Sequence, residues 1–207
     1  MSDTIVKRPY RSPLRQAQAE QTRQRILDAG LGLFAERGYP ATSVAQIAAA
    51  AGVSAETIYT SVGSKRGIID ALLEQVDSER PIERARASVI ERGGTPRVAL
   101  EVFAETAGNF WAAHSKLVEV LRKGVGDPEI GGAWFERESG RRALFADAVG
   151  HWPPGTLREG LDPERAADIA WVLTAEESYG RLVERRGWPL EDYIAWTSSM
   201  LIDQILA

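Results

Sequence analysis

Two short helical segments joined by a glycine turn, between residues 42 and 60, constrain the fold more than any other feature of the sequence. In the first segment, Ser43 and Gln46 have the spacing of a capping box, in which the serine and glutamine side chains each bond the other residue's amide. Gly52 ends this segment, and Ser54 is placed to cap the next one. Two short helices separated by a tight turn that contains glycine are typical of a helix-turn-helix unit.

The segments around this unit are also helical in pattern. Apolar residues recur at helical spacing from residue 15 to 37 and again from Lys65 towards Pro81. Beyond them, the same spacing predicts helices at residues 82–91, 96–113, 115–123, 128–149, 163–185 and 189–206. The sequence therefore predicts an all-α fold with a flexible basic arm at 1–14, a three-helix helix-turn-helix domain at 15–63, and a larger helical domain at 64–207.

Charge is distributed unevenly along the chain. Basic residues outnumber acidic ones by nine to five between Met1 and Arg66, so the remaining residues carry −8 in a chain whose total is −4. A basic end on an acidic body favours contact with a polyanion at that end, although a basic arm can also serve solubility alone. Lys7, Arg8, Arg11 and Arg15 could enter a DNA minor groove or touch only phosphate.

Several classes of function are disfavoured by what the sequence lacks. The chain has no cysteine and two histidines, so we expect no metal site and no cofactor. It has no Gly-x-Ser-x-Gly, P-loop or Gly-x-Gly-x-x-Gly motif, and Glu176 and Glu177 are adjacent on a helix and point apart, so we expect no enzyme. With neither a signal segment nor an apolar run of membrane-spanning length, we expect a cytoplasmic protein with no membrane partner.

The second helix of the unit has the properties of a helix that reads duplex DNA. Such a helix is short, polar on its outer face and apolar behind, and its first residues meet base edges in the major groove. Val53 and Ile58 are placed to hold it to the domain, while hydroxyls and Lys65 can bind phosphates. The predicted DNA-binding residues are Thr42, Ser43, Ser54, Ala55, Glu56, Thr57, Tyr59, Thr60, Ser61 and Lys65. Glu56 can accept from a cytosine amine or be repelled by the DNA backbone.

Residues 22–73 resemble the N-terminal domain of the tetracycline-repressor-like (TetR) family. The resemblance is carried by the run from Arg25 to Tyr39, by residues 42–48, by Ala51-Gly-Val-Ser54, by Thr57-Ile-Tyr59 and by Ser64-Lys65. One position departs from the family pattern, because Val62 stands where an aromatic residue is usual. A valine buries less apolar area, so the junction after the reading helix is expected to be looser.

For the C-terminal part, the resemblance implies pairing of two copies through the last two helices as a four-helix bundle. An apolar stripe fits such a seam, although it could also face the chain's own core. The predicted interface consists of Leu173, Tyr179, Leu182, Val183, Ile194, Thr197, Leu201, Ile202 and Ile205.

The resemblance also implies a small-molecule site inside the C-terminal part, where large rings are numerous. Pockets are commonly apolar with a few converging polar groups, although core packing also explains any single ring. The predicted lining is Phe103, Phe110, Trp111, His114, Trp134, Phe135, Trp171 and Glu176, with Asn109 as a further polar candidate.

Together these features predict a homodimeric transcriptional repressor that binds a palindromic double-stranded DNA operator and is released by a small hydrophobic or aromatic effector. Two alternatives remain open at this point, a transcriptional activator and a helical adaptor of the same fold that has lost DNA binding. Glu56 and Val62 are the residues that favour the adaptor.

Overall fold

The computed structural model describes residues 13–79 and 81–207, and the chain divides into two compact units at Leu73/Glu74. The boundary falls inside a helix, later than the predicted boundary after Gly63. Throughout the described residues the chain is helical, with an isolated antiparallel bridge between Leu157 and Leu206. The all-α prediction is confirmed.

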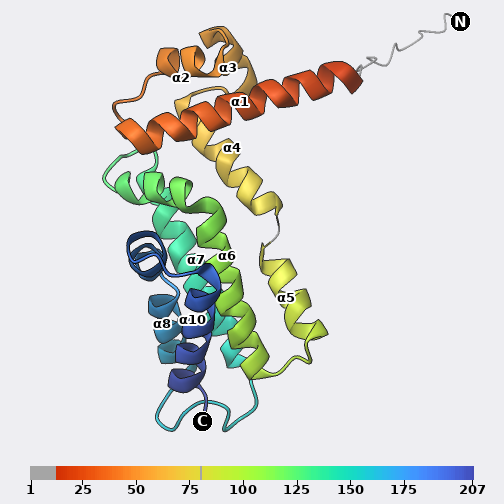
Figure 1. Ribbon diagram of the computed structural model, residues 1–207. Helices are drawn as coiled ribbons and strands as arrows, with labels where there is room; N and C mark the ends of the chain where they lie inside the picture. The colour runs from red at the N-terminus through yellow and green to blue at the C-terminus, as the bar shows by residue number, and fades with distance from the viewer. Residues whose placement is uncertain (1–12, 80) are drawn as a thin grey trace, which may run out of the picture. The chain divides into compact units, whose positions relative to one another are not determined.

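The first unit contains α1 (Pro13–Arg37), α2 (Val44–Ala51), α3 (Ala55–Val62) and most of α4 (Lys65–Ser78). Helices α1, α2 and α3 pack against one another (Figure 1). The core of this unit is formed by fully or almost fully buried side chains of all four helices: Ile26, Leu27, Phe34, Ile47, Ile58, Ile68 and Ile69. Helix α1 begins two residues earlier than predicted, at Pro13, a residue suited to a first helical turn.

The second unit contains the end of α4 and seven further elements. They are α5 (Pro81–Glu91), α6 (Pro96–Lys123), α7 (Gly131–Gly150), α8 (Pro163–Leu173), α9 (Glu176–Tyr179), the π-helix η1 (Gly180–Arg185) and α10 (Leu190–Ile205). Figure 1 shows α6 and α10 side by side, with α8 next to α10. One core cluster gathers around Leu100, Phe145, Leu201 and Ile205, and a second around Trp111, Val118, Tyr179 and Tyr193.

Three predicted boundaries in this unit were wrong. Helix α6 continues through His114 without a break, because residues 96–123 keep one buried face. Helix α7 begins at Gly131 instead of Pro128. The helix predicted at 163–185 is broken after Leu173, where Thr174 donates its hydroxyl to the carbonyl oxygen of Ala170 at 2.7 Å. No helix of the described segments is long and apolar enough to cross a bilayer.

Candidate nucleic-acid interface and interior polar site

The turn between α2 and α3 has the local geometry that the sequence predicts. Ser43 accepts from the amide of Gln46 at 3.3 Å, and the Gln46 side chain accepts from the Ser43 amide at 2.8 Å, which completes the capping box. Gly52 adopts a left-handed conformation with φ of 67°, which costs a glycine little because it has no Cβ. Ser54 then caps α3 by accepting from the amide of Thr57 at 3.1 Å.

Helix α3 presents a polar face to solvent over an apolar anchor. Ile58 is fully buried and holds the helix to the domain core. Ala55, Glu56, Tyr59 and Thr60 are exposed, with 56% of Tyr59 accessible. Glu56 lies in the first turn of the helix, where a negative charge is favoured by the helix dipole. The exposed face is therefore short, polar and rigidly held.

The hydroxyls of Ser54, Thr57 and Thr60 and the backbone of Ser61 are engaged in local bonds. The hydroxyls of Ser54 and Thr57 lie 2.9 Å apart, and Thr60 donates to the carbonyl oxygen of Glu56 at 2.8 Å. Ser61 is half-buried, and its carbonyl oxygen accepts from Arg23 at 3.0 Å. These side chains thus order the helix before any partner binds.

Two residues predicted to bind DNA make contacts within the domain. Thr42 is 2% exposed, and its hydroxyl lies 2.9 Å from the carbonyl oxygen of Gly38, so assigning it to phosphate was wrong. Lys65 donates from Nζ to the carbonyl oxygen of Tyr39 at 3.0 Å and stands 4.1 Å from the centre of the Tyr39 ring. Its ammonium therefore fastens the start of α4 to the end of α1, an arrangement that sequence spacing did not reveal.

Only one of the four basic residues of the predicted arm lies among the residues that the structure describes. Lys7, Arg8 and Arg11 lie outside the described residues, whereas Arg15 is exposed in the first turn of α1. Val62, the departure from the family pattern, is half-buried at the end of α3.

The predicted pocket residues do not converge on one place. Phe103 packs in the first core cluster against Phe145, whereas Phe110 and Trp111 belong to the second. Phe135 is 58% exposed and Trp171 is 37% exposed. The structure does not describe the side chain of Trp134. Asn109 donates to the carbonyl oxygen of Glu105 on its own helix.

The two predicted polar lining residues have their own partners. His114 lies 3.3 Å from Glu79 at the end of α4, and its ring packs against that of Phe110. Glu176 forms an ion pair with Arg122 at 3.2 Å, and only 12% of its side chain is exposed. Burial raises the pKa of Glu176, and the positive charge of Arg122 opposes that rise.

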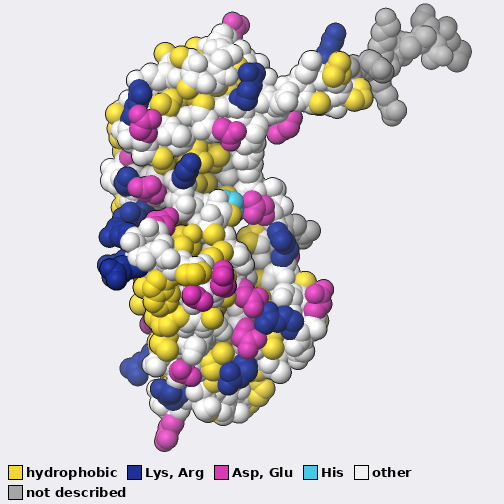
Figure 2. Space-filling view, in the orientation of Figure 1, with side chains coloured by type: hydrophobic (Ala, Val, Ile, Leu, Met, Phe, Trp, Pro, Cys, Tyr) yellow, Lys and Arg dark blue, Asp and Glu magenta, His cyan; other side chains and the backbone are white. Residues whose placement is uncertain are grey.

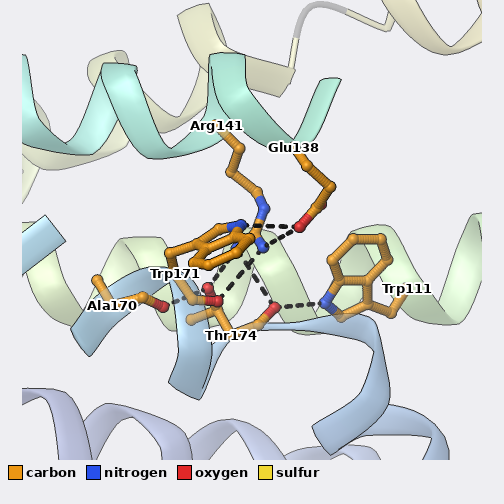
Figure 3. Close-up of polar contacts among 6 residues, drawn as sticks. All are labelled: Trp111, Glu138, Arg141, Ala170, Trp171 and Thr174. Carbon is orange, nitrogen blue, oxygen red and sulfur yellow. Dashed lines mark hydrogen bonds and ion pairs between the residues drawn. The ribbon is translucent and has the colours of Figure 1, made fainter. Parts of the chain in front are cut away.

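Sequence reasoning missed a network of polar side chains around Arg141, the Arg141 network, which joins three helices (Figure 3). Arg141 reaches from α7 to the end of α8, where it donates to the hydroxyl of Thr174 at 2.5 Å and to Glu138 at 3.1 Å. Glu138 also accepts from the indole of Trp171 at 2.8 Å. The indole of Trp111, on α6, donates to the carbonyl oxygen of Thr174 at 2.9 Å.

This network explains why α8 ends at Leu173. The carbonyl end of a helix carries partial negative charge and leaves its last oxygens unbonded. Arg141 supplies a partly buried cation and donors at that end, with contacts of 3.4 Å to the carbonyl oxygens of Trp171 and Thr174. The spacing of Glu138 and Arg141 is that of an ordinary surface ion pair, so nothing in the sequence signalled an interior role.

The predicted dimer seam is divided by burial. Tyr179, Thr197, Leu201 and Ile205 are at most 6% exposed within the single chain, so placing them at an interface was wrong. They face the chain's own core, which was the alternative reading of the stripe. The partly exposed members are Leu173, Leu182, Val183, Ile194 and Ile202. Next to them on α8, Trp171 and Val172 are 37% and 59% exposed.

The described geometry defines an all-helical protein with an N-terminal helix-turn-helix domain. Residues 26–72 match the sequence model for "Bacterial regulatory proteins, tetR family", so this N-terminal segment is similar to that family.

The chain is 44% identical over 59 residues to the HTH-type transcriptional regulator YvkB of Bacillus subtilis, covering 28% of this chain and 31% of that one. It spans well under two thirds of the length of the first curated relatives that it matches. Among solved structures, the SmeT–triclosan complex has a TM-score of 0.71 at 22% identity and covers 90% of this chain and 92% of its own. NalD, the secondary repressor of the MexAB-OprM multidrug efflux pump in Pseudomonas aeruginosa, has a TM-score of 0.68 at 20% identity, with coverages of 91% and 98%.

Proposed function

We propose that the chain is a transcriptional regulator that binds duplex DNA through α3. The observation that carries this proposal is a capped, exposed helix whose apolar side is anchored by fully buried Ile58. The DNA major groove admits an α-helix whose side chains bond base edges. Tyr59, Thr60 and Glu56 are the exposed side chains of α3 that would face those edges.

The regulator acts as a homodimer on a palindromic operator. Two copies of α3 must reach successive major grooves, about 34–36 Å apart, which a two-fold symmetric dimer accomplishes. Figure 2 shows hydrophobic side chains gathered on the visible face over the part of the second unit that holds α8 and α10. Val172, Trp171 and Trp188 are large exposed apolar residues of this unit, and a second copy would cover them.

A small molecule bound in the second unit releases the DNA. The similarity to NalD, a repressor, and to SmeT, solved with triclosan, supports repression and effector binding. The effector is expected to favour a dimer whose two α3 helices are wrongly spaced for DNA. Effector binding then weakens DNA binding, and DNA binding weakens effector binding by the same free energy.

A helical adaptor without DNA binding is the second candidate, and exposed Glu56 favours it. A carboxylate on the reading face is repelled by phosphates, which would weaken binding.

Fluorescence anisotropy with fragments of the DNA upstream of the chain's own gene separates these two functions. We expect sequence-preferring binding that weakens with salt, and at least about a fivefold loss for Tyr59→Ala, since a good base contact is worth about 1–3 kcal/mol. Glu56→Gln removes the carboxylate that the phosphates repel, so it should strengthen binding to every sequence. Glu136→Gln removes the same charge from α7 and is its matched control. Binding that ignores salt and sequence would favour the adaptor.

Sedimentation of the full chain tests the dimer. Val172→Glu places a charge on the exposed face of α8, whereas Ile90→Glu makes the same kind of change at a residue of α5 that is 75% exposed. We expect Val172→Glu to produce monomers and Ile90→Glu to leave the dimer intact. Equal behaviour of the two variants would place the interface elsewhere.

A further inference from the structure

Three buried side-chain atoms lack a hydrogen-bond partner in the part of the chain that the structure describes. They are Nε of Arg141, Oη of Tyr193 and Oγ1 of Thr197, here called the unpaired polar cluster. Tyr193 and Thr197 are fully buried, and Arg141 keeps 18% of its side chain exposed. Buried polar groups are almost always paired, so three unpaired atoms in one helical unit call for an explanation.

The three atoms belong to one region of the second unit. Tyr193 and Thr197 are one turn apart on α10, so they share a helix face. Burial raises the pKa of Tyr193, and the positive charge of Arg141 opposes that rise. The guanidinium of Arg141 on α7 stands over the ring of Trp111, which packs in the same core cluster as Tyr193, so Arg141 and this face of α10 border one cluster. The raised pKa keeps the Tyr193 phenol neutral at physiological pH.

The surroundings of the unpaired polar cluster are aromatic. The guanidinium carbon of Arg141 lies 5.7 Å from the ring centre of Trp111. The Tyr193 ring packs edge-on against Tyr179 at 5.6 Å and near Trp196 at 6.5 Å. Flat apolar molecules pack well against such rings.

The charge of Arg141 is already balanced. Glu138 accepts from Arg141 at 3.1 Å, and the carbonyl oxygens at the end of α8 face the guanidinium (Figure 3). An anion brought beside Nε would be repelled by Glu138 in a region of low dielectric. The unpaired donors therefore favour a neutral oxygen acceptor over a carboxylate.

We propose that the unpaired polar cluster recognises a neutral, mainly aromatic effector that carries a carbonyl or phenolic oxygen. The oxygen accepts from Nε of Arg141 and from the hydroxyl of Tyr193 or Thr197, and the ring packs among Trp111 and Tyr179. Because Tyr193 and Thr197 are fully buried, neighbouring side chains must move to admit the molecule. This inference rests on the proposed effector-controlled function and names the class of effector.

Three probes of similar size test the chemistry on the full chain without DNA: acetophenone, ethylbenzene and benzoate, each at millimolar concentration. Acetophenone carries the acceptor, ethylbenzene replaces it with hydrocarbon, and benzoate adds charge. The readouts are the thermal unfolding midpoint and the ¹⁵N–¹H resonance of the Arg141 side-chain Nε. This resonance is assigned as the signal that disappears in Arg141→Lys. Arg142, exposed on the same helix and paired with Asp168, provides the control resonance.

We expect acetophenone to move the Arg141 resonance, to leave that of Arg142 in place, and to bind about fivefold more tightly than ethylbenzene, the value of one net hydrogen bond. Tyr193→Phe and Thr197→Val keep the shape of the interior, so they should fold and reduce this preference. No binding by any probe, equal binding of ethylbenzene, or tightest binding of benzoate would overturn the inference. DNA binding is measured separately, so a chain that shows the expected pattern but ignores DNA would refute only the proposed function.

Discussion

Replacing Gly108 with alanine tests the packing of α6 against α10 in the second unit. Gly108 lies on α6 where that helix meets α10, and an added Cβ would stand 2.6 Å from Cγ1 and 3.1 Å from Cδ1 of Ile194. Gly140, within α7, is the matched control, because nothing lies within 4 Å of its added Cβ. The two substitutions are chemically identical and differ only in what the new methyl group meets.

The expected effects have opposite signs. Within a helix, alanine is favoured over glycine by about 0.8–1 kcal/mol, so Gly140→Ala should stabilise the unit by up to that amount. At Gly108 the same gain is opposed by overpacking, which costs about 1–3 kcal/mol in a well-packed interior. Cγ1 of Ile194 is next to its backbone and has little freedom to move away. We therefore expect Gly108→Ala to destabilise the unit by up to about 2 kcal/mol.

Urea unfolding followed by tryptophan fluorescence measures this difference. All six tryptophans lie between residues 111 and 196, so the signal reports on the second unit alone. The midpoint should fall for Gly108→Ala and rise for Gly140→Ala, with the slope unchanged in both. A rise of similar size in both variants would refute the close approach of α6 and α10.

Three further substitutions test single interactions. Glu176→Gln should stabilise the fold at neutral pH and have little effect on stability well below pH 4.5. The reason is that burial raises the pKa of Glu176 above its ordinary 4.5 despite the charge of Arg122, so the ionised carboxylate is disfavoured in the fold. A gain in stability at acid pH alone would contradict this. Lys65→Met should lower both the unfolding midpoint of the first unit and the affinity for every DNA sequence, since the contact of Lys65 with Tyr39 orients α4. Unchanged stability with weaker DNA binding would instead indicate that Lys65 contacts phosphate directly. Ser43→Ala should cost about 1 kcal/mol, the usual value of an N-cap, measured by thermal unfolding, and no loss would show that α2 needs no cap.

The sequence by itself determined the local structure of the first unit. The capping box at Ser43, the end of α2 at Gly52 and the cap of α3 at Ser54 were all predictable, because each depends on atoms within a few residues of one another. The apolar spacing around Ile58 likewise predicted which face of α3 is buried.

Only the tertiary structure decided which side chains from distant segments meet. Thr42 and Lys65 have residue types that suit phosphate, but Thr42 bonds backbone of the α1 end and Lys65 bonds Tyr39. The end of α8 depends on Arg141, 33 residues before Thr174, and no local pattern predicts that pairing. Periodicity shows that one face of a helix is buried but not what covers it. That is why the apolar stripe of α10 fitted a dimer seam in sequence and is partly core in the fold.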